Sequence, residues 1–168
     1  SLNSPKGVKV KKIVSAEQML NEVKRTLPVD LAVCTAAVVD FKPAEKSKNK
    51  IKKDIFKLKS INFIKNNDIL DFLSKNNRNR PQIVAGFSAE TQSVIKNSTQ
   101  KMKNKNCDII FANDVSKKDI GFNSEFNEVS MIDQKGNVNI IPKNKKSFIA
   151  NKIAQILLNK LIDDRNIN

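Results

Sequence analysis

The 168-residue chain contains no histidine, tryptophan or tyrosine, and it has only four glycines. Without histidine, its own residues cannot build a Ser-His-Asp triad, a Cys-His dyad or a histidine-ligated metal site. With so few glycines, it contains neither a G-x-G-x-x-G nor a G-x-x-x-x-G-K-[ST] phosphate loop. These absences exclude the commonest hydrolase and metal-centre arrangements and the usual glycine-rich nucleotide loops from these residues.

Cysteine is also scarce, because only Cys34 and Cys107 are present, far apart and without a C-x-x-C pair. Each lies in or beside an apolar run, which is typical of a buried, reduced thiol on a strand. Reduced thiols fit a reducing compartment, so we expect a cytoplasmic protein. No apolar run approaches the ~20 residues of a membrane-spanning helix, and the first residues do not resemble a signal peptide, so we expect no membrane partner.

Positive charge is what the chain has in excess, with 31 Lys and Arg against 17 Asp and Glu and a formal net charge of +14. Either lysine is simply favoured throughout, or the protein binds an anion such as a nucleotide, a phosphorylated metabolite or nucleic acid. Proteins that bind single-stranded nucleic acid usually place aromatic side chains between the basic ones. Aromatic residues make up only 5% of this chain, all of them Phe, which argues against nucleic acid.

Apolar runs alternate along the chain with amphipathic segments, and this order predicts an α/β fold. The spacing predicts strands over 8–14, 31–37, 58–64, 83–87 and 108–112, helices over 15–27, 68–73, 90–105 and 149–161, and a mobile lysine-rich loop over 42–59. Two further strands, 128–133 and 138–141, flank a Lys-Gly-Asn turn and predict a β-hairpin. We therefore expect an open, mostly parallel sheet with helices on both faces and an edge β-hairpin.

Polar motifs follow three of the predicted strands, at Ala36 to Asp40, Gly86 to Glu90 and Ala112 to Asp114. In open α/β sheets, ligands bind beyond the carboxyl ends of the strands. The three motifs are therefore expected to meet at one anion-binding site.

The candidate residues of this site each have a structural alternative. Asp40 could accept a hydrogen bond from a sugar hydroxyl or hold a metal–phosphate group, or it could cap a turn. Lys50 could close over a triphosphate or belong to a solvated run of charge. Lys101 and Lys105, at i and i+4 of a predicted helix, repel each other by about a few tenths of a kcal/mol unless an anion lies between them.

Two further candidates stay open in the same way. Gly86 permits close approach of a ligand to the backbone, and Phe87 beside it could stack on a base or pack in the core. Asn113 and Asp114 could bind a ligand or form an Asx turn.

In combination, the motifs resemble one known family. They are A-A-V-x-D-[FW]-x-P at 36–43, K-I-K-K at 50–53, G-F-x-A-E-T at 86–91, A-N-D-V-S at 112–116 and G-F-N-S at 121–124. The series is similar to the phosphopantothenate–cysteine ligase (phosphopantothenoylcysteine synthetase) domain of the bifunctional coenzyme A biosynthesis flavoprotein, from about Gly7 to Leu161. The resemblance implies a Rossmann-like sheet and one ligase domain over residues 1–168.

The resemblance also implies a reaction and its partners. Such an enzyme ligates cysteine to 4′-phosphopantothenate through an acyl-cytidylate, with CTP as a substrate and Mg²⁺ as a cofactor. It implies a homodimer, and a phosphopantothenoylcysteine decarboxylase domain or protein that would carry the FMN. The family's N-terminal glycine-rich segment, with an Asn that stabilises the acyl-cytidylate, has no match here. We therefore expect the domain to be N-terminally incomplete and to turn over little by itself.

Carried over motif by motif, the resemblance gives the candidates their roles. Lys50 would be the catalytic lysine, on a flap over the phosphates, and Ala37 and Asn113 would bind the substrate. The residues expected to bind CTP are Cys34, Thr35, Ala36, Asp40, Lys50, Asn67, Asp68, Ile69, Leu70, Phe87, Lys101 and Lys105. Asn67 stands where the family usually has proline, and no residue is assigned to a metal.

Two other functions remain as alternatives. A non-catalytic basic module that binds nucleotide, nucleic acid or an acidic protein would explain the charge, and its binding to DNA would depend steeply on salt but not on sequence. A dinucleotide-dependent enzyme is disfavoured by the missing glycine fingerprint.

Overall fold

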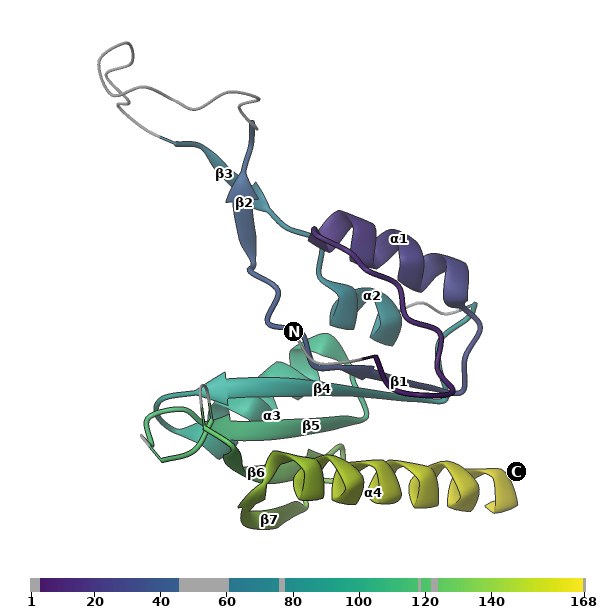
Figure 1. Cartoon of the computed structure of the whole chain (residues 1–168), viewed down its shortest axis with the longest axis vertical. Helices are drawn as coiled ribbons and strands as arrows, with labels where there is room; N and C mark the ends of the chain where they lie inside the picture. Colours follow the sequence, from purple (N-terminus) through teal and green to yellow (C-terminus); the bar gives the residue numbers. More distant parts are fainter. Residues whose placement is uncertain (1–3, 46–60, 76–77, 118, 122–123, 168) are drawn as a thin grey trace. The chain divides into compact units, whose positions relative to one another are not determined.

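The computed structural model describes residues 4–45, 61–75, 78–117, 119–121 and 124–167, which divide into two compact units, 1–25 with 37–68 and 26–36 with 69–168. The elements, in chain order, are α1 (Ala16–Thr26), β1 (Leu31–Cys34), β2 (Phe41–Pro43), β3 (Phe63–Lys65), α2 (Ile69–Lys75), β4 (Ile83–Glu90), α3 (Val94–Lys105), β5 (Ile109–Asp114), β6 (Phe126–Asp133), β7 (Val138–Lys145) and α4 (Lys146–Ile167) (Figure 1).

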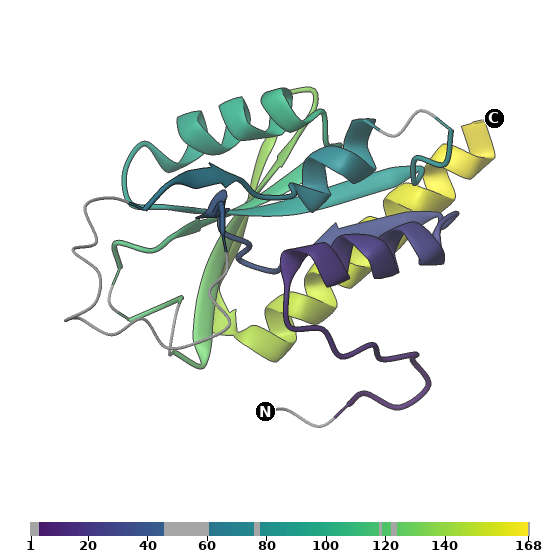
Figure 2. The same ribbon diagram turned by 90° about the horizontal axis from the view of Figure 1, so that it is seen from above.

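The larger unit contains a five-stranded sheet in the order β1-β4-β5-β6-β7. β1, β4 and β5 run parallel, and the β6–β7 hairpin adds to β5 in the antiparallel sense. Within this unit α2 and α3 cover one face of the sheet and α4 covers the other (Figure 2). The open, mostly parallel sheet with helices on both faces and an edge hairpin, predicted from the sequence, is confirmed.

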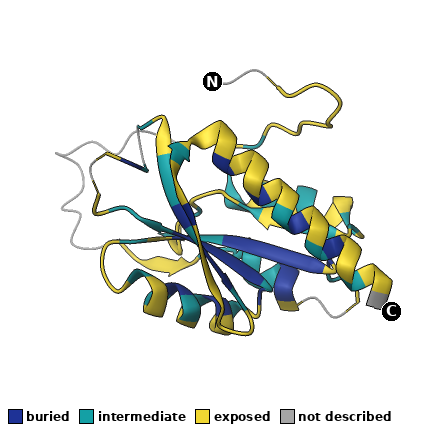
Figure 3. Cartoon of the chain, turned by 90° about the horizontal axis from the view of Figure 1, so that it is seen from below, coloured by how far each residue is buried: buried dark blue, intermediate teal, exposed yellow. Residues whose placement is uncertain are grey.

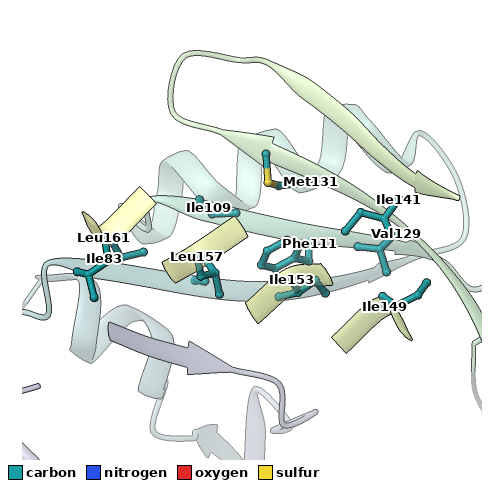
Figure 4. Packing of buried hydrophobic residues seen from close by; sticks show 11 residues of the cluster. Ile83, Ile109, Phe111, Val129, Met131, Ile141, Ile149, Ile153, Leu157 and Leu161 are labelled. Atoms are coloured by element: carbon teal, nitrogen blue, oxygen red, sulfur yellow. The ribbon is translucent and has the colours of Figure 1, made fainter. Parts of the chain in front are cut away.

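The main core lies between the sheet and α4. Ile149, Ile153, Leu157 and Leu161 recur every four residues along α4 and pack on the buried side chains of the central strands, which are Ile83, Ala85, Ile109, Phe111, Val129, Met131 and Ile141 (Figure 4). Each Ile or Leu buried in this way stabilises the fold by about 1.5–3 kcal/mol. The predicted stripe on the last helix is therefore the stripe that faces the sheet.

The smaller unit contains most of α1 and a two-stranded antiparallel ribbon of β2 and β3. The Ser15 Oγ accepts a hydrogen bond from the Gln18 N–H at 3.2 Å, and the Gln18 Oε1 accepts one from the Val14 N–H at 2.8 Å. This is a capping box in which the glutamine reaches one residue further back than usual. At the base of the ribbon, Asn66 donates from its backbone N–H to the Asp40 carbonyl at 2.8 Å.

Several strand predictions were wrong in place or length. Residues 8–14 form no strand, because a strand needs a neighbour for its backbone hydrogen bonds and none of the described strands pairs with them. The strand predicted over 31–37 ends at Cys34, and Lys42 and Pro43, the first residues of the predicted loop, belong to β2. The residue before a proline is held in an extended conformation, which accounts for the strand there.

The helix predicted from Glu90 begins only at Val94, since β4 continues to Glu90 and Ser93 adopts a left-handed φ of 47°. The short helix predicted after Asp68 is confirmed as α2. The predicted mobile loop lies mostly in 46–60, outside the described residues, and so does Lys50.

Candidate functional site

The carboxyl ends of β1, β4 and β5 form one edge of the sheet, because the three strands run parallel (Figure 1). Cys34 pairs with Gly86, and Asn113 pairs with Ala89. Residues 34–36, 86–90 and 112–114 therefore meet at this edge within the larger unit, whereas residues 37–40 of the first predicted segment belong to the smaller unit. Thr35 and Ala36 follow β1 directly and are exposed there.

Asp114 forms a turn at this edge. Its Oδ1 accepts hydrogen bonds from the Ser116 hydroxyl at 2.5 Å and from the Ser116 backbone N–H at 3.0 Å. The same two bonds, the hydroxyl first, hold the pKa of Asp114 below its usual range. Of the two alternatives left open for Asp114, the structure shows the Asx turn.

Asn113 is oriented by a residue that the sequence did not point to. The Asn127 Nδ2 of β6 donates to the Asn113 Oδ1 at 3.2 Å, which leaves the Asn113 amide N–H groups to donate elsewhere. The Asn127 Oδ1 is buried, and no hydrogen bond reaches it from the described residues. No motif marks Asn127; only the register of the predicted hairpin against its neighbour strand could have suggested it.

A cavity of about 450 Å³ lies between β1 and α4. Its walls are mostly apolar, and its polar residues, Thr35, Asn127 and Lys146, come from the carboxyl edge of the sheet. The lining residues are Leu31, Val33, Thr35, Phe87, Asn127, Val129, Lys146, Ile149, Ala150, Ile153, Ala154, Leu157 and Leu158. Phe87 forms part of the wall and packs on Phe111, with ring centroids 5.2 Å apart, so its ring belongs at least partly to the core.

Ile69 and Leu70 lie on the other face of the sheet from Phe87. A Cβ atom on Gly86 would come within 2.6 Å of the Leu70 Cδ2, so the space beside this glycine is filled by α2. Consecutive strand residues face opposite sides, and Phe87 therefore points away from Leu70. The close approach that the sequence suggested for a ligand at Gly86 is made by the Leu70 side chain.

Lys101 and Lys105 are half-buried in the last two turns of α3. α3 begins beside the carboxyl end of β4 and ends before β5, so both lysines lie toward the amino edge of the sheet. The 12-residue helix is about 18 Å long at 1.5 Å per residue. The structure does not bring these lysines to the edge where Cys34 and Asn113 lie, and their role in phosphate binding stays a prediction.

The other predicted residues belong to the smaller unit or lie outside the described residues. Ala37, Asp40 and Asn67 are in the smaller unit, and so is Asp68. Asp40 is exposed and uses its backbone carbonyl to hold Asn66. Their roles in binding stay predictions, as does that of Lys50.

Several other ionisable groups of the described residues have partners or are buried. Lys117 pairs with Glu128 at 2.5 Å, and this hydrogen bond raises its pKa. Arg80 and Asp108 join the amino ends of β4 and β5, because the Asp108 Oδ2 accepts from the Arg80 Nη2 at 2.9 Å and from the Val84 N–H at 2.7 Å. Burial raises the pKa of the Cys107 thiol to about 11, so this thiol stays protonated and is no nucleophile.

Two features are absent from the described residues. These residues contain no group of three or more His, Cys, Asp or Glu side chains placed to hold a metal ion. Within the same part of the chain, no helix has the length and apolar character needed to span a membrane.

Comparison with known proteins gives a consistent result. The model of the family described as DNA/pantothenate metabolism flavoprotein C-terminal domain matches residues 1–161. The coenzyme A biosynthesis bifunctional protein CoaBC of Borreliella burgdorferi is 35% identical over 157 residues, which cover 92% of this chain and 39% of that protein. Its counterpart in Escherichia coli K12 is 33% identical over 172 residues, which cover 99% of this chain and 41% of that protein.

A solved structure agrees with these sequences. The crystal structure of the C-terminal domain of a coenzyme A biosynthesis bifunctional protein CoaBC matches with a TM-score of 0.75 and 29% identity. The match covers 97% of this chain and 71% of that chain. The chain thus has the Rossmann-like fold of that domain, and it spans about two fifths of the length of the curated relatives it matches.

Proposed function

Because the chain belongs to the DNA/pantothenate metabolism flavoprotein C-terminal domain family, we propose that it performs the ligase step of coenzyme A biosynthesis. In this step CTP drives the ligation of cysteine to 4′-phosphopantothenate. The observation that carries the proposal is the meeting of residues 34–36, 86–90 and 112–114 at one sheet edge, because each segment lies in or runs into a motif that resembles the ligase family.

The proposed reaction has two steps. A carboxylate oxygen of 4′-phosphopantothenate attacks the α-phosphorus of CTP, and pyrophosphate leaves as the acyl-cytidylate forms. The cysteine amine then attacks the acyl carbon, loses a proton and displaces CMP. Negative charge develops on the reacting groups in both steps, so the site must offer oriented hydrogen-bond donors and cations that stabilise it.

The chain's own residues can supply part of this. The Asn113 amide, held by Asn127, is set to donate to an anionic substrate. Lys50 is the proposed catalytic lysine, because its ammonium group can neutralise the charge that develops on departing pyrophosphate. Thr35 and Ala36, just beyond β1, would hold the nucleotide with backbone groups.

Mg²⁺ would enter with the nucleotide. Mg²⁺ is usually bound by substrate phosphates together with one or two carboxylates rather than by a cage of protein ligands, and the described residues contain no such cage. When bound, it neutralises part of the triphosphate charge. We further propose a homodimer, with the FMN-dependent decarboxylation performed by a separate domain or protein.

Calorimetry tests whether the chain binds the proposed nucleotide. We expect CTP to bind at a single site and more tightly than ATP, and the Lys50→Gln variant to bind it more weakly than Lys52→Gln, which removes a neighbouring charge as a matched control. Equal affinity for both nucleotides, or equal effects of the two substitutions, would contradict the assignment.

The high positive charge favours one other function, a basic module that binds nucleic acid. Such a module would bind duplex DNA of any sequence. The logarithm of its binding constant would fall linearly with the logarithm of the salt concentration. If that behaviour appeared and CTP did not compete, the ligase proposal would have to be abandoned.

A further inference from the structure

β5 separates from its antiparallel neighbour before it reaches the candidate site. Its ladder with β6 ends at the pair Ala112–Ser130. Its ladder with β4 continues to the pair Glu90–Asp114. The central strands of the sheet are mostly buried (Figure 3), and β5 becomes half-buried only at Asn113 and Asp114. Backbone pairing therefore fixes the last two residues of β5 on one side only, and side-chain contacts must hold them on the side of β6.

The backbone of β6 is also weakly fixed at this place. β6 pairs with β7 at Asn127 and again at Val129, but the register shifts between these two residues. β6 has only Glu128 there, whereas β7 has two residues, Pro142 and Lys143. An extra residue of this kind makes a β-bulge, and proline suits a bulge because it has no N–H to donate to the ladder. Around Glu128 the ladder is thus interrupted toward β7 and has already ended toward β5.

Two side-chain contacts span the place where β5 and β6 separate. Asn127 lines the cavity beside α4, and its Nδ2 donates to the Asn113 Oδ1 at 3.2 Å. Consecutive strand residues face opposite sides of a sheet, so Glu128 points away from α4. There its Oε1 accepts a hydrogen bond from the Lys117 Nζ at 2.5 Å. The end of β5 and the residues after it are therefore joined to β6 on both faces of the sheet.

The turn after β5 brings Lys117 back toward β6. The Asp114 carboxylate accepts two hydrogen bonds from Ser116, one from its hydroxyl and one from its backbone N–H. The Val115 N–H donates to the Glu90 carbonyl at 3.0 Å, which keeps the turn attached to β4. The residues of the A-N-D-V-S motif thus divide into two groups, because Asn113 lies at the candidate site while Asp114 and Ser116 form the turn that leads to Lys117.

We propose that Lys117 and Glu128 are positioning residues for Asn113. Their ion pair keeps β6 against the end of β5, and this placement maintains the hydrogen bond through which Asn127 orients the Asn113 amide. The two charged residues act through the amides and do not touch the substrate themselves. The assignment of an anionic substrate to Asn113 rests on the proposed function, whereas the coupling of the ion pair to the two amides does not.

The ion pair is expected to affect orientation more than stability. The side chains of Lys117 and Glu128 are 46% and 32% exposed, and an exposed ion pair contributes little to the free energy of unfolding. Asp119 and Lys143 form a matched pair, which fastens the same loop to β7 instead of β6. Removal of either ion pair should change the unfolding temperature by a similar small amount. Only the loss of the Lys117–Glu128 pair should disturb the Asn127 amide.

NMR of the chain without ligand tests the coupling directly. The side-chain amide protons of Asn127 should exchange with water about two to five times faster in Glu128→Gln than in the parent, a range that the small free energy of an exposed ion pair allows. The charge swap Lys117→Glu with Glu128→Lys should restore the parent rate. Asp119→Asn, which removes the matched pair, should leave the rate unchanged. Equal rates in Glu128→Gln and the parent, equal acceleration in Asp119→Asn, or a swap that restores nothing would overturn the proposal.

Calorimetry with 4′-phosphopantothenate tests the consequence for the site. Glu128→Gln should weaken binding by about two- to fivefold in the parent and have no effect in the Asn113→Ala background, because the orientation of that amide then no longer matters. Equal weakening in the two backgrounds would show that Glu128 does not act through Asn113 and would overturn the proposal. If the parent does not bind 4′-phosphopantothenate, the proposed function fails, and the exchange rates of the Asn127 amide still decide whether the ion pair positions the two amides.

Discussion

Among single residues, the Asn113–Asn127 pair shows how the candidate site is held. One amide orients the other through a part-buried hydrogen bond of 3.2 Å, and the Asn127 Oδ1 has no partner among the described residues. A buried amide that loses its partner costs about 1–3 kcal/mol, whereas removal of both partners can be nearly neutral. Substitutions of Asn113 and of Asn127 should therefore not have independent effects on stability.

Asn113→Ala should lower the free energy of unfolding by more than Asn127→Leu, because it leaves the buried Asn127 amide with no partner for its donor. The double variant should be less destabilised than the sum of the two single variants, by about 0.5–3 kcal/mol. Urea unfolding of the four proteins measures this coupling. Strict additivity would mean that the hydrogen bond contributes nothing.

Cys107 gives a prediction about pH. Its folded pKa is raised by burial from 9.0 to about 11, so the unfolded thiol ionises at a lower pH than the folded one. The stabilisation is complete below pH 9 and is lost as the pH rises to 11, because ionisation then favours the unfolded chain. The unfolding temperature of the parent should fall more steeply over this range than that of Cys107→Ala, which shares the lysine titrations. If the unfolding temperatures of the two proteins fell equally with pH, the raised pKa of Cys107 would be contradicted.

The sequence predicted the surroundings of some individual residues and gave no indication for others. Both cysteines were predicted to be buried on strands, but Cys107 is buried just before β5, and Cys34 on β1 is only partly buried. Gly86 was expected to permit the close approach of a ligand, whereas the neighbour that lies against it is Leu70 of α2, because a sequence does not say which element approaches a glycine. Asn127 carries no local signal, since its importance comes from a strand pairing.

The elements were more predictable where their signals are local. The capping box before α1, the apolar stripe of α4 and the Lys135-Gly136-Asn137 turn were each confirmed. The strand predicted over 8–14 has the right alternation, but pairing with a neighbour decides whether a strand forms, and alternation says nothing of that neighbour. The start of α3 was placed too early because β4 extends three residues beyond the predicted strand, to Glu90, into a motif that looks helical.

The contact between α2 and β4 provides a prediction at this scale. Gly86→Ala should lower the free energy of unfolding by about 1–3 kcal/mol, since its Cβ would lie 2.6 Å from the Leu70 Cδ2 and the leucine must move. Shortening the leucine in the double variant Gly86→Ala with Leu70→Ala should remove the clash. Denaturant midpoints of both single variants and the double variant test this. A Gly86→Ala protein as stable as the parent would show that Leu70 and α2 can move away without loss of stability.

For the whole molecule, the central claim joins the family and the candidate site. The larger unit brings residues 34–36, 86–90 and 112–114 to one edge of its sheet. The sequence predicted that a segment needed for catalysis has no match in the chain.

The most direct measurement is pyrophosphate release that depends on CTP, 4′-phosphopantothenate and cysteine together. Loss of one oriented donor typically slows catalysis by about 10²–10³-fold. The chain fused, before Ser1, to the N-terminal glycine-rich segment of a related ligase should therefore turn over at least about 100 times faster than the 168-residue chain alone, and Lys50→Gln in the fusion should return it to the lower rate. Equally fast release by the unfused chain, or no release by a folded fusion, would contradict the account.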